Sequence, residues 1–205
     1  MTTAIIFIVS FFSALAVYGG VYAVERTEAK KSMPFAAGLF LAYLASLAIP
    51  AELAWLLNAF VLAGAVGLGV FISRFLTARV NIATFCIVAS VVDYLSFSGG
   101  LTAMITEKFQ SGESNLLYHL AISFPLDGVF RPLVGMGDLT VMGALFAALL
   151  RLKYSLAVAF LPPTVGLMLA VVFALIYGSI FALPFICGAT LVFLAFRKNT
   201  KPKKK

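Results

Sequence analysis

The stretch of sequence that decides the fold spans residues 154–196 and reads YSLAVAFLPPTVGLMLAVVFALIYGSIFALPFICGATLVFLAF. It contains no Asp, Glu, Lys or Arg. Its length suffices for two crossings of a lipid bilayer at about 20 residues each. Since the core of a water-soluble domain does not need so long an uncharged run, this stretch predicts a protein that spans a membrane.

The rest of the 205-residue chain has the same character. Hydrophobic residues make up 62% of it and charged residues 11%, whereas a soluble domain is about half apolar and about a quarter charged. We expect helices, because an open sheet in lipid leaves backbone groups unpaired. Seven apolar segments have the length of a membrane-crossing helix: residues 4–24, 34–49, 53–73, 80–97, 133–150, 155–177 and 180–196. The prediction is an all-α polytopic membrane protein with about seven transmembrane helices.

The distribution of basic residues indicates the orientation of these segments. All Lys and Arg residues except Lys108 and Arg131 fall in the first, third and fifth connections or in the C-terminal tail. Cytoplasmic loops carry an excess of Lys and Arg, so we expect the N-terminus outside and the C-terminus in the cytoplasm. The membrane would be the cell membrane of a prokaryote or an ER-type membrane of a eukaryote.

The same distribution explains the formal net charge of +7. A basic tail directly after an apolar helix is typical of an anchor on anionic lipid. We therefore expect membrane lipid as a partner, and no nucleic acid. The chain has one histidine, His119, and two cysteines, Cys86 and Cys187, which lie in different apolar segments. This pattern predicts no metal site.

Two aspartates, Asp93 and Asp138, lie inside apolar segments. Ionisable side chains are costly in hydrocarbon and therefore mark candidate functional sites. Asp93 is about four residues from the outer end of its segment and Asp138 about five from the outer start of its own, which at ~1.5 Å per residue places both some 6–8 Å below the same face. Neighbouring antiparallel helices would bring the two carboxyl groups into one layer, where they could share a single proton.

The aspartate pair by itself leaves several classes of function open. One protonated and one ionised carboxyl group can activate water and protonate an amide, as in aspartic proteases. Paired intramembrane acids also serve proton-coupled transporters and cation channels. An isolated aspartate can, in addition, be a structural hydrogen-bonding group between helices.

The residues around the aspartates narrow this choice. Asp138 follows Gly135, Met136 and Gly137, and glycine lets another backbone approach closely. Glycine is also common in membrane helices because it permits tight packing, so this motif is a modest signal alone. Near the outer end of the last apolar segment, on the side of both aspartates, stand Ala182 and Leu183.

Together these segments resemble the presenilin and signal-peptide-peptidase family of GxGD intramembrane aspartyl proteases. The stretch Ile122-Ser123-Phe124-Pro125, the motif Gly135-Met136-Gly137-Asp138 and residues 143–151 are similar to the family's segment around its second catalytic aspartate. Asp93 occupies the place of the first. The resemblance covers roughly residues 80–196, with two spans after the GxGD helix as in the family.

The chain also departs from the family pattern. The family usually has Tyr before its first aspartate, whereas here Val92 precedes Asp93 and Tyr94 follows it. The family's Pro-Ala-Leu motif corresponds to Phe181-Ala182-Leu183, so Phe181 replaces the proline. Family members typically have nine spans with the aspartates on the sixth and seventh. We therefore expect a presenilin-like core that lacks the first two helices.

The resemblance implies an intramembrane-cleaving aspartic endopeptidase that hydrolyses peptide bonds within transmembrane segments or signal peptides. Asp93 and Asp138 would be its catalytic acid and base, transmembrane-segment peptides its substrates, and no metal or organic cofactor would be required. Residues 1–79 would form a three-helix scaffold and residues 80–205 the catalytic membrane region. The alternatives are a proton- or cation-coupled transporter or channel that uses the aspartate pair, and an inactive relative that binds membrane helices. The oligomeric state stays open.

The resemblance also implies which residues line the site. Its wall would be formed by Gly135, Met136, Gly137, Ala182 and Leu183. Residues Ile122, Ser123 and Phe124 are either a strand that pairs with an unwound substrate by strand addition or a plain loop.

Overall fold

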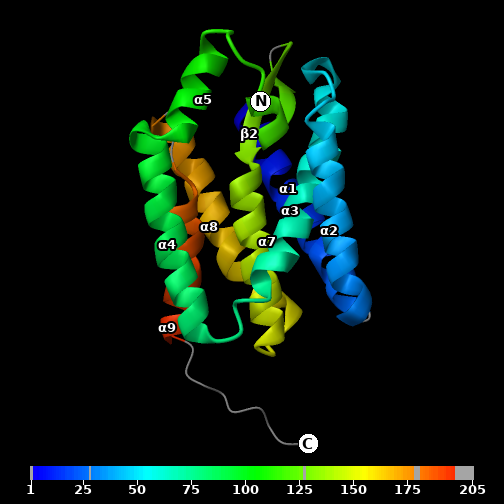
Figure 1. The fold of residues 1–205 in the computed structure, drawn as a ribbon. Helices are drawn as coiled ribbons and strands as arrows, with labels where there is room; N and C mark the ends of the chain where they lie inside the picture. The colour runs from blue at the N-terminus through cyan, green and yellow to red at the C-terminus, as the bar shows by residue number, and fades with distance from the viewer. Residues whose placement is uncertain (1, 28, 127, 178–180, 197–205) are drawn as a thin grey trace, which may run out of the picture.

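The computed structural model describes residues 2–27, 29–126, 128–177 and 181–196. Within this part, long helices lie side by side in a bundle with a two-stranded hairpin near one end (Figure 1). The helices are α1 Thr2–Arg26, α2 Ala29–Ser46, α3 Ala54–Ser73, α4 Arg79–Gly99, α5 Leu101–Gln110, α6 Leu117–Leu120, α7 Met136–Arg151, α8 Leu156–Tyr177 and α9 Leu183–Phe196. The strands are β1 Ala121–Leu126 and β2 Val129–Gly135, and a 3₁₀ turn, η1 Ala51–Leu53, precedes α3.

Within the described part of the chain, four helical segments are long and apolar enough to cross a membrane: α1, the continuous η1 and α3, α4, and α8. The remaining long helices fall short of that standard for identifiable reasons. α2 begins with a segment that contains Lys30 and Lys31, α7 has 16 residues, and α9 has 14. The structure thus supports a helical membrane protein, while the count of seven spans stays a prediction.

The segment expected as a helix over residues 133–150 begins later than its apolar sequence predicts. Its first three residues belong to β2, and α7 starts at Met136. The hairpin accounts for the difference, because Val134 and Gly135 pair with Ile122 and Ala121 of β1 in an antiparallel register. The backbone groups of this stretch are therefore engaged in strand pairing. Residues Ile122, Ser123 and Phe124 accordingly lie in a strand, and not in a plain loop.

The segment expected over residues 180–196 also begins later, with α9 starting at Leu183, and residue 180 lies outside the described residues. Pro184 occupies the first turn of α9. A proline there costs no intrahelical hydrogen bond, because the first N–H groups of a helix have no partner within it.

Helix α7 lies in the middle of the bundle, with α4 and α9 to one side and α2 to the other (Figure 1). Most of its 16 residues are buried, and they supply many of the largest fully buried side chains, among them Leu139, Met142, Leu145, Phe146 and Leu149. α7 packs against α1, α3 and α8. Residues 1–79 and the segment after residue 80 therefore share one apolar core.

Helices α8 and α9 approach each other closely at Gly166 of α8. A Cβ atom at this position would lie 2.5 Å from the carbonyl oxygen of Phe185 and 2.7 Å from the backbone nitrogen of Ile186. These are backbone atoms of α9, which cannot move aside without shifting the helix. The absence of a side chain at Gly166 thus sets the spacing of the two helices.

This spacing predicts that Gly166→Ala destabilises the protein by about 1–3 kcal/mol, the usual effect of inserting a methyl group into a packed core. The measurement is the midpoint of thermal unfolding in detergent. Gly188→Ala is the matched control, because a Cβ on Gly188 of α9 would meet nothing within 4 Å. Equal midpoints for both variants would contradict the close approach at Gly166.

Candidate active site

Both aspartates line one cavity of about 470 Å³. Its walls come from α3, α4, α5, α6, the hairpin, α7 and the first residue of α9. The lining residues are Leu68, Ile72, Phe85, Asp93, Thr102, Ile105, Leu117, Leu120, Ala121, Gly135, Met136, Gly137, Asp138, Thr140, Val141 and Leu183. Asp93 and Asp138 are each partly exposed. Two carboxyl groups are therefore accessible within one largely apolar cavity.

Some of the residues predicted to form the wall line the cavity, and others do not. Gly135, Met136, Gly137 and Leu183 line the cavity with the two aspartates. Ala182 is next to the cavity along the chain and packs against the hydrophobic core. Ile122 and Ser123 are buried, whereas Phe124 is exposed. These three strand residues are not among the residues that line the cavity.

Asp138 is the third residue of α7 and lies in its first turn. The N-terminal turn of a helix favours a negative charge, because its free N–H groups and the helix dipole point toward that end. Gly135 precedes the helix with an extended backbone. A Cβ atom on Gly135 would lie only 3.0 Å from Oδ2 of Asp138, whereas one on Gly137 would meet nothing within 4 Å. The first glycine of the motif therefore leaves room for the carboxyl group, and the second faces open space.

Asp93 of α4 is connected directly to the start of α9. The backbone N–H of Leu183 donates a hydrogen bond to Asp93 Oδ2 at 3.1 Å. Leu183 is the first residue of α9, where N–H groups have no partner within the helix and favour an anion. The Ala182-Leu183 segment thus contacts the candidate site through its backbone.

Phe181, which precedes α9, contacts two aromatic residues of α4. The ring of Phe181 packs edge-on against Tyr94, with ring centroids 5.5 Å apart, and against Phe97 at 5.8 Å. Tyr94 directly follows Asp93, and Phe181 precedes Ala182. Edge-to-face aromatic pairs of this kind stabilise a contact beyond the area they bury. The aromatic contact therefore holds α4 to the segment before α9, next to the Asp93–Leu183 hydrogen bond.

Asn58 is a residue not predicted from the sequence, and it connects the hairpin to α3. Its side-chain Nδ2 donates a hydrogen bond to the carbonyl oxygen of Ser123 at 2.7 Å, and its Oδ1 accepts one from the Ser123 N–H at 2.8 Å. Both backbone groups of Ser123 are thus engaged, so a substrate strand could pair there only by displacing Asn58. The feature of the sequence that could have indicated a role for Asn58 is its side-chain amide in the otherwise apolar segment 53–73.

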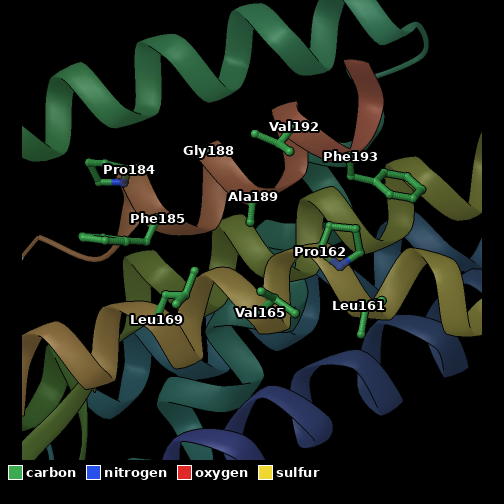
Figure 2. Close-up of a pocket in the computed structure, with 10 residues that line it drawn as sticks. All are labelled: Leu161, Pro162, Val165, Leu169, Pro184, Phe185, Gly188, Ala189, Val192 and Phe193. Atoms are coloured by element: carbon green, nitrogen blue, oxygen red, sulfur yellow. The ribbon is translucent and has the colours of Figure 1, made fainter. Parts of the chain in front are cut away.

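A larger groove of about 530 Å³ lies between α8 and α9. Figure 2 shows its ten lining residues, all of them apolar and all contributed by these two helices. None of them carries a group that can transfer a proton. The groove therefore does not compete with the aspartate cavity as a candidate catalytic site.

Across residues 2–27, 29–126, 128–177 and 181–196, no three His, Cys, Asp or Glu side chains gather into a group that could hold a metal ion. Cys86 and Cys187 are buried free thiols on α4 and α9. Among the residues that line the cavity, Asp93 and Asp138 are the ones with ionisable side chains.

Comparison with known proteins yields no match among family models, curated proteins or solved structures. The function is therefore inferred from the residues of this chain and from the geometry that brings them together.

Proposed function

We propose that this protein is an intramembrane-cleaving aspartic endopeptidase of the presenilin and signal-peptide-peptidase type, which hydrolyses peptide bonds within transmembrane segments or signal peptides. The observation that carries the proposal is the cavity that Asp93 and Asp138 line together. Acidic residues in apolar helices are costly and are retained where they have a function. Two of them in one accessible cavity provide an acid and a base for a single reaction.

In the proposed reaction, the cavity admits one water molecule and one unwound segment of substrate. The ionised aspartate takes a proton from the water as its oxygen attacks the scissile carbonyl, and the protonated aspartate gives its proton to the leaving amide nitrogen. The Leu183 N–H holds Oδ2 of Asp93, which leaves proton transfer at this residue to Oδ1. Either aspartate can begin as the base, since the roles exchange over one turnover.

The apolar walls fit a substrate taken from the membrane. Leu68, Ile72, Phe85 and Ile105 line the cavity together with the two acids. A substrate helix hides its carbonyl groups in internal hydrogen bonds and must unwind locally before cleavage. The hairpin ends at Gly135, beside the cavity, and strand backbone there is well placed to bond an unwound segment. Because Asn58 engages Ser123 on β1, β2 is the strand we assign to this pairing.

The proposed membrane topology has seven spans, with α2, α7 and α9 completing the set. Short helices are compatible with spanning, because irregular backbone is tolerated at membrane depth where protein buries it. The ends of α1, α3 and α7 meet, since Arg151 donates a hydrogen bond from Nε to Oε2 of Glu25 at 3.1 Å and Arg74 lies 3.8 Å from the same carboxylate. This meeting supports placing the connections rich in Lys and Arg together on the cytoplasmic side.

The proposal predicts that Asp93→Asn and Asp138→Asn each lower cleavage of a single-span substrate by about 10²–10⁴-fold, the usual contribution of a general acid or base. The measurement is the cleavage rate of purified protein in liposomes, with folding checked by thermal unfolding. Glu52→Gln is the control, because Glu52 is an exposed acid in the turn before α3. Undiminished cleavage by either aspartate variant would refute the assignment. Proton or cation flux without proteolysis would favour a transporter.

A second prediction concerns the first glycine of the motif. Gly135→Ala places a methyl group against the Asp138 carboxyl group, and a displaced catalytic group costs on the order of 10-fold to 100-fold in rate. We expect a lower kcat with nearly unchanged thermal stability, because the crowded atom belongs to a movable side chain. Gly38→Ala in α2 is the control, since its Cβ would meet nothing within 4 Å. A wild-type kcat for Gly135→Ala would argue against the observed position of the Asp138 carboxyl group.

A further inference from the structure

Asn58 is an unusual residue for its position. Helix α3 is otherwise almost entirely apolar, with the sequence AWLLNAFVLAGAVGLGVFIS. A side-chain amide in such a helix is costly unless its donor and acceptor are both bonded. Both are bonded here, and to the same residue, because Asn58 donates to the Ser123 carbonyl and accepts from the Ser123 N–H.

This arrangement imitates a neighbouring strand. A carboxamide presents an N–H donor beside a carbonyl acceptor, as a strand backbone does, and has a second N–H besides; the two bonds of 2.7 and 2.8 Å have good lengths. Across the hairpin, Ser123 lies opposite Pro132, which has no N–H to donate. The register of the hairpin also shifts between Ile122 and Ser123. Asn58 thus bonds β1 at the point where its pairing with β2 is irregular.

Ser123, to which Asn58 bonds, lies close to the candidate site along the paired strands β1 and β2. Two residues before Ser123, Ala121 pairs with Gly135 and also lines the cavity. Gly135 in turn directly precedes α7 and lies against the carboxyl group of Asp138. A shift of β1 relative to α3 would therefore move Gly135. The space available to the Asp138 carboxyl group would change as a result.

We propose that Asn58 is a positioning residue of the active site, whose carboxamide fixes β1 on α3 and so holds Gly135 and Asp138 in their places, while it closes the β1 edge at Ser123 to substrate. The inference rests on the proposed proteolytic function. The closed β1 edge also affects the cleavage products. A substrate that can pair with only one strand edge is held in one register and is cut at one position. Loss of Asn58 frees a second edge and permits additional registers.

The experiment compares Asn58→Leu with Asn58→Gln in the full-length protein in liposomes. Leucine is branched at Cγ like asparagine, suits an apolar helix and lacks both hydrogen bonds. Glutamine keeps the carboxamide on a longer side chain. For Asn58→Leu we expect kcat to fall on the order of 10-fold to 100-fold and mass spectrometry to show new cleavage positions. For Asn58→Gln we expect a smaller loss of kcat and mainly the original products.

A second readout does not depend on cleavage. Hydrogen exchange of the β1 amides is expected to speed up in Asn58→Leu and to stay near wild type in Asn58→Gln. Asn81→Ala is the matched control, because Asn81 also donates its side-chain N–H to a backbone carbonyl, that of Phe75, but at the far end of α4. It should leave kcat, products and β1 exchange unchanged.

Unchanged kcat and unchanged cleavage positions in Asn58→Leu would overturn the inference while leaving the proteolytic function intact. A loss of activity in proportion to lost folded protein, with the original products only, would overturn it as well. If wild-type protein does not cleave at all while Asn58→Leu still accelerates β1 exchange, the proposed function has failed and the positioning role in catalysis fails with it.

Discussion

The hydrogen bond from the Leu183 N–H to Asp93 is the interaction on which the candidate site depends. Helix α4 buries only Ile82 and Cys86, and its main partners in the bundle are α9 and the adjoining α5. Near the site, α4 is therefore positioned by the Asp93–Leu183 bond and by the packing of Phe181 on Tyr94 and Phe97. A carboxylate at the start of a helix is favourable in itself, so the contact that orients Asp93 also stabilises the beginning of α9.

Asp138 is held in a different way. Its helix, α7, is enclosed by α1, α3 and α8 and forms the centre of the core. A Cβ atom on Gly69 of α3 would lie 3.2 Å from the Thr140 carbonyl oxygen, which shows how closely α3 and α7 approach. One aspartate thus lies on a rigid central helix and the other on a peripheral helix held mainly by α9. The site combines a fixed acid with one whose position is set by a few specific contacts.

Much of this arrangement was predictable from the sequence, because apolar runs determine membrane helices and ionisable residues within them are rare. Counting residues along helices predicts a common depth for Asp93 and Asp138, and the structure shows both lining one cavity. The start of α7 was predicted wrongly, since a short apolar strand and a buried helix cannot be told apart by periodicity, and pairing between β1 and β2 decides between them. The hydrogen bonds of Asn58 and the Tyr94–Phe181 contact were not predicted, because both depend on which distant segments the fold brings together.

The proposed protease requires that Asp93 and Asp138 act on one reacting centre. Equilibrium binding of a substrate peptide whose scissile amide is replaced by a hydroxyethylene group tests this requirement, because enzymes bind mimics of the transition state more tightly than substrates. We expect wild-type protein to bind this peptide more tightly than the parent peptide, and Asp93→Asn and Asp138→Asn each to abolish the difference. Equal affinity of both peptides for wild-type protein, or an undiminished difference in either variant, would contradict a shared catalytic centre.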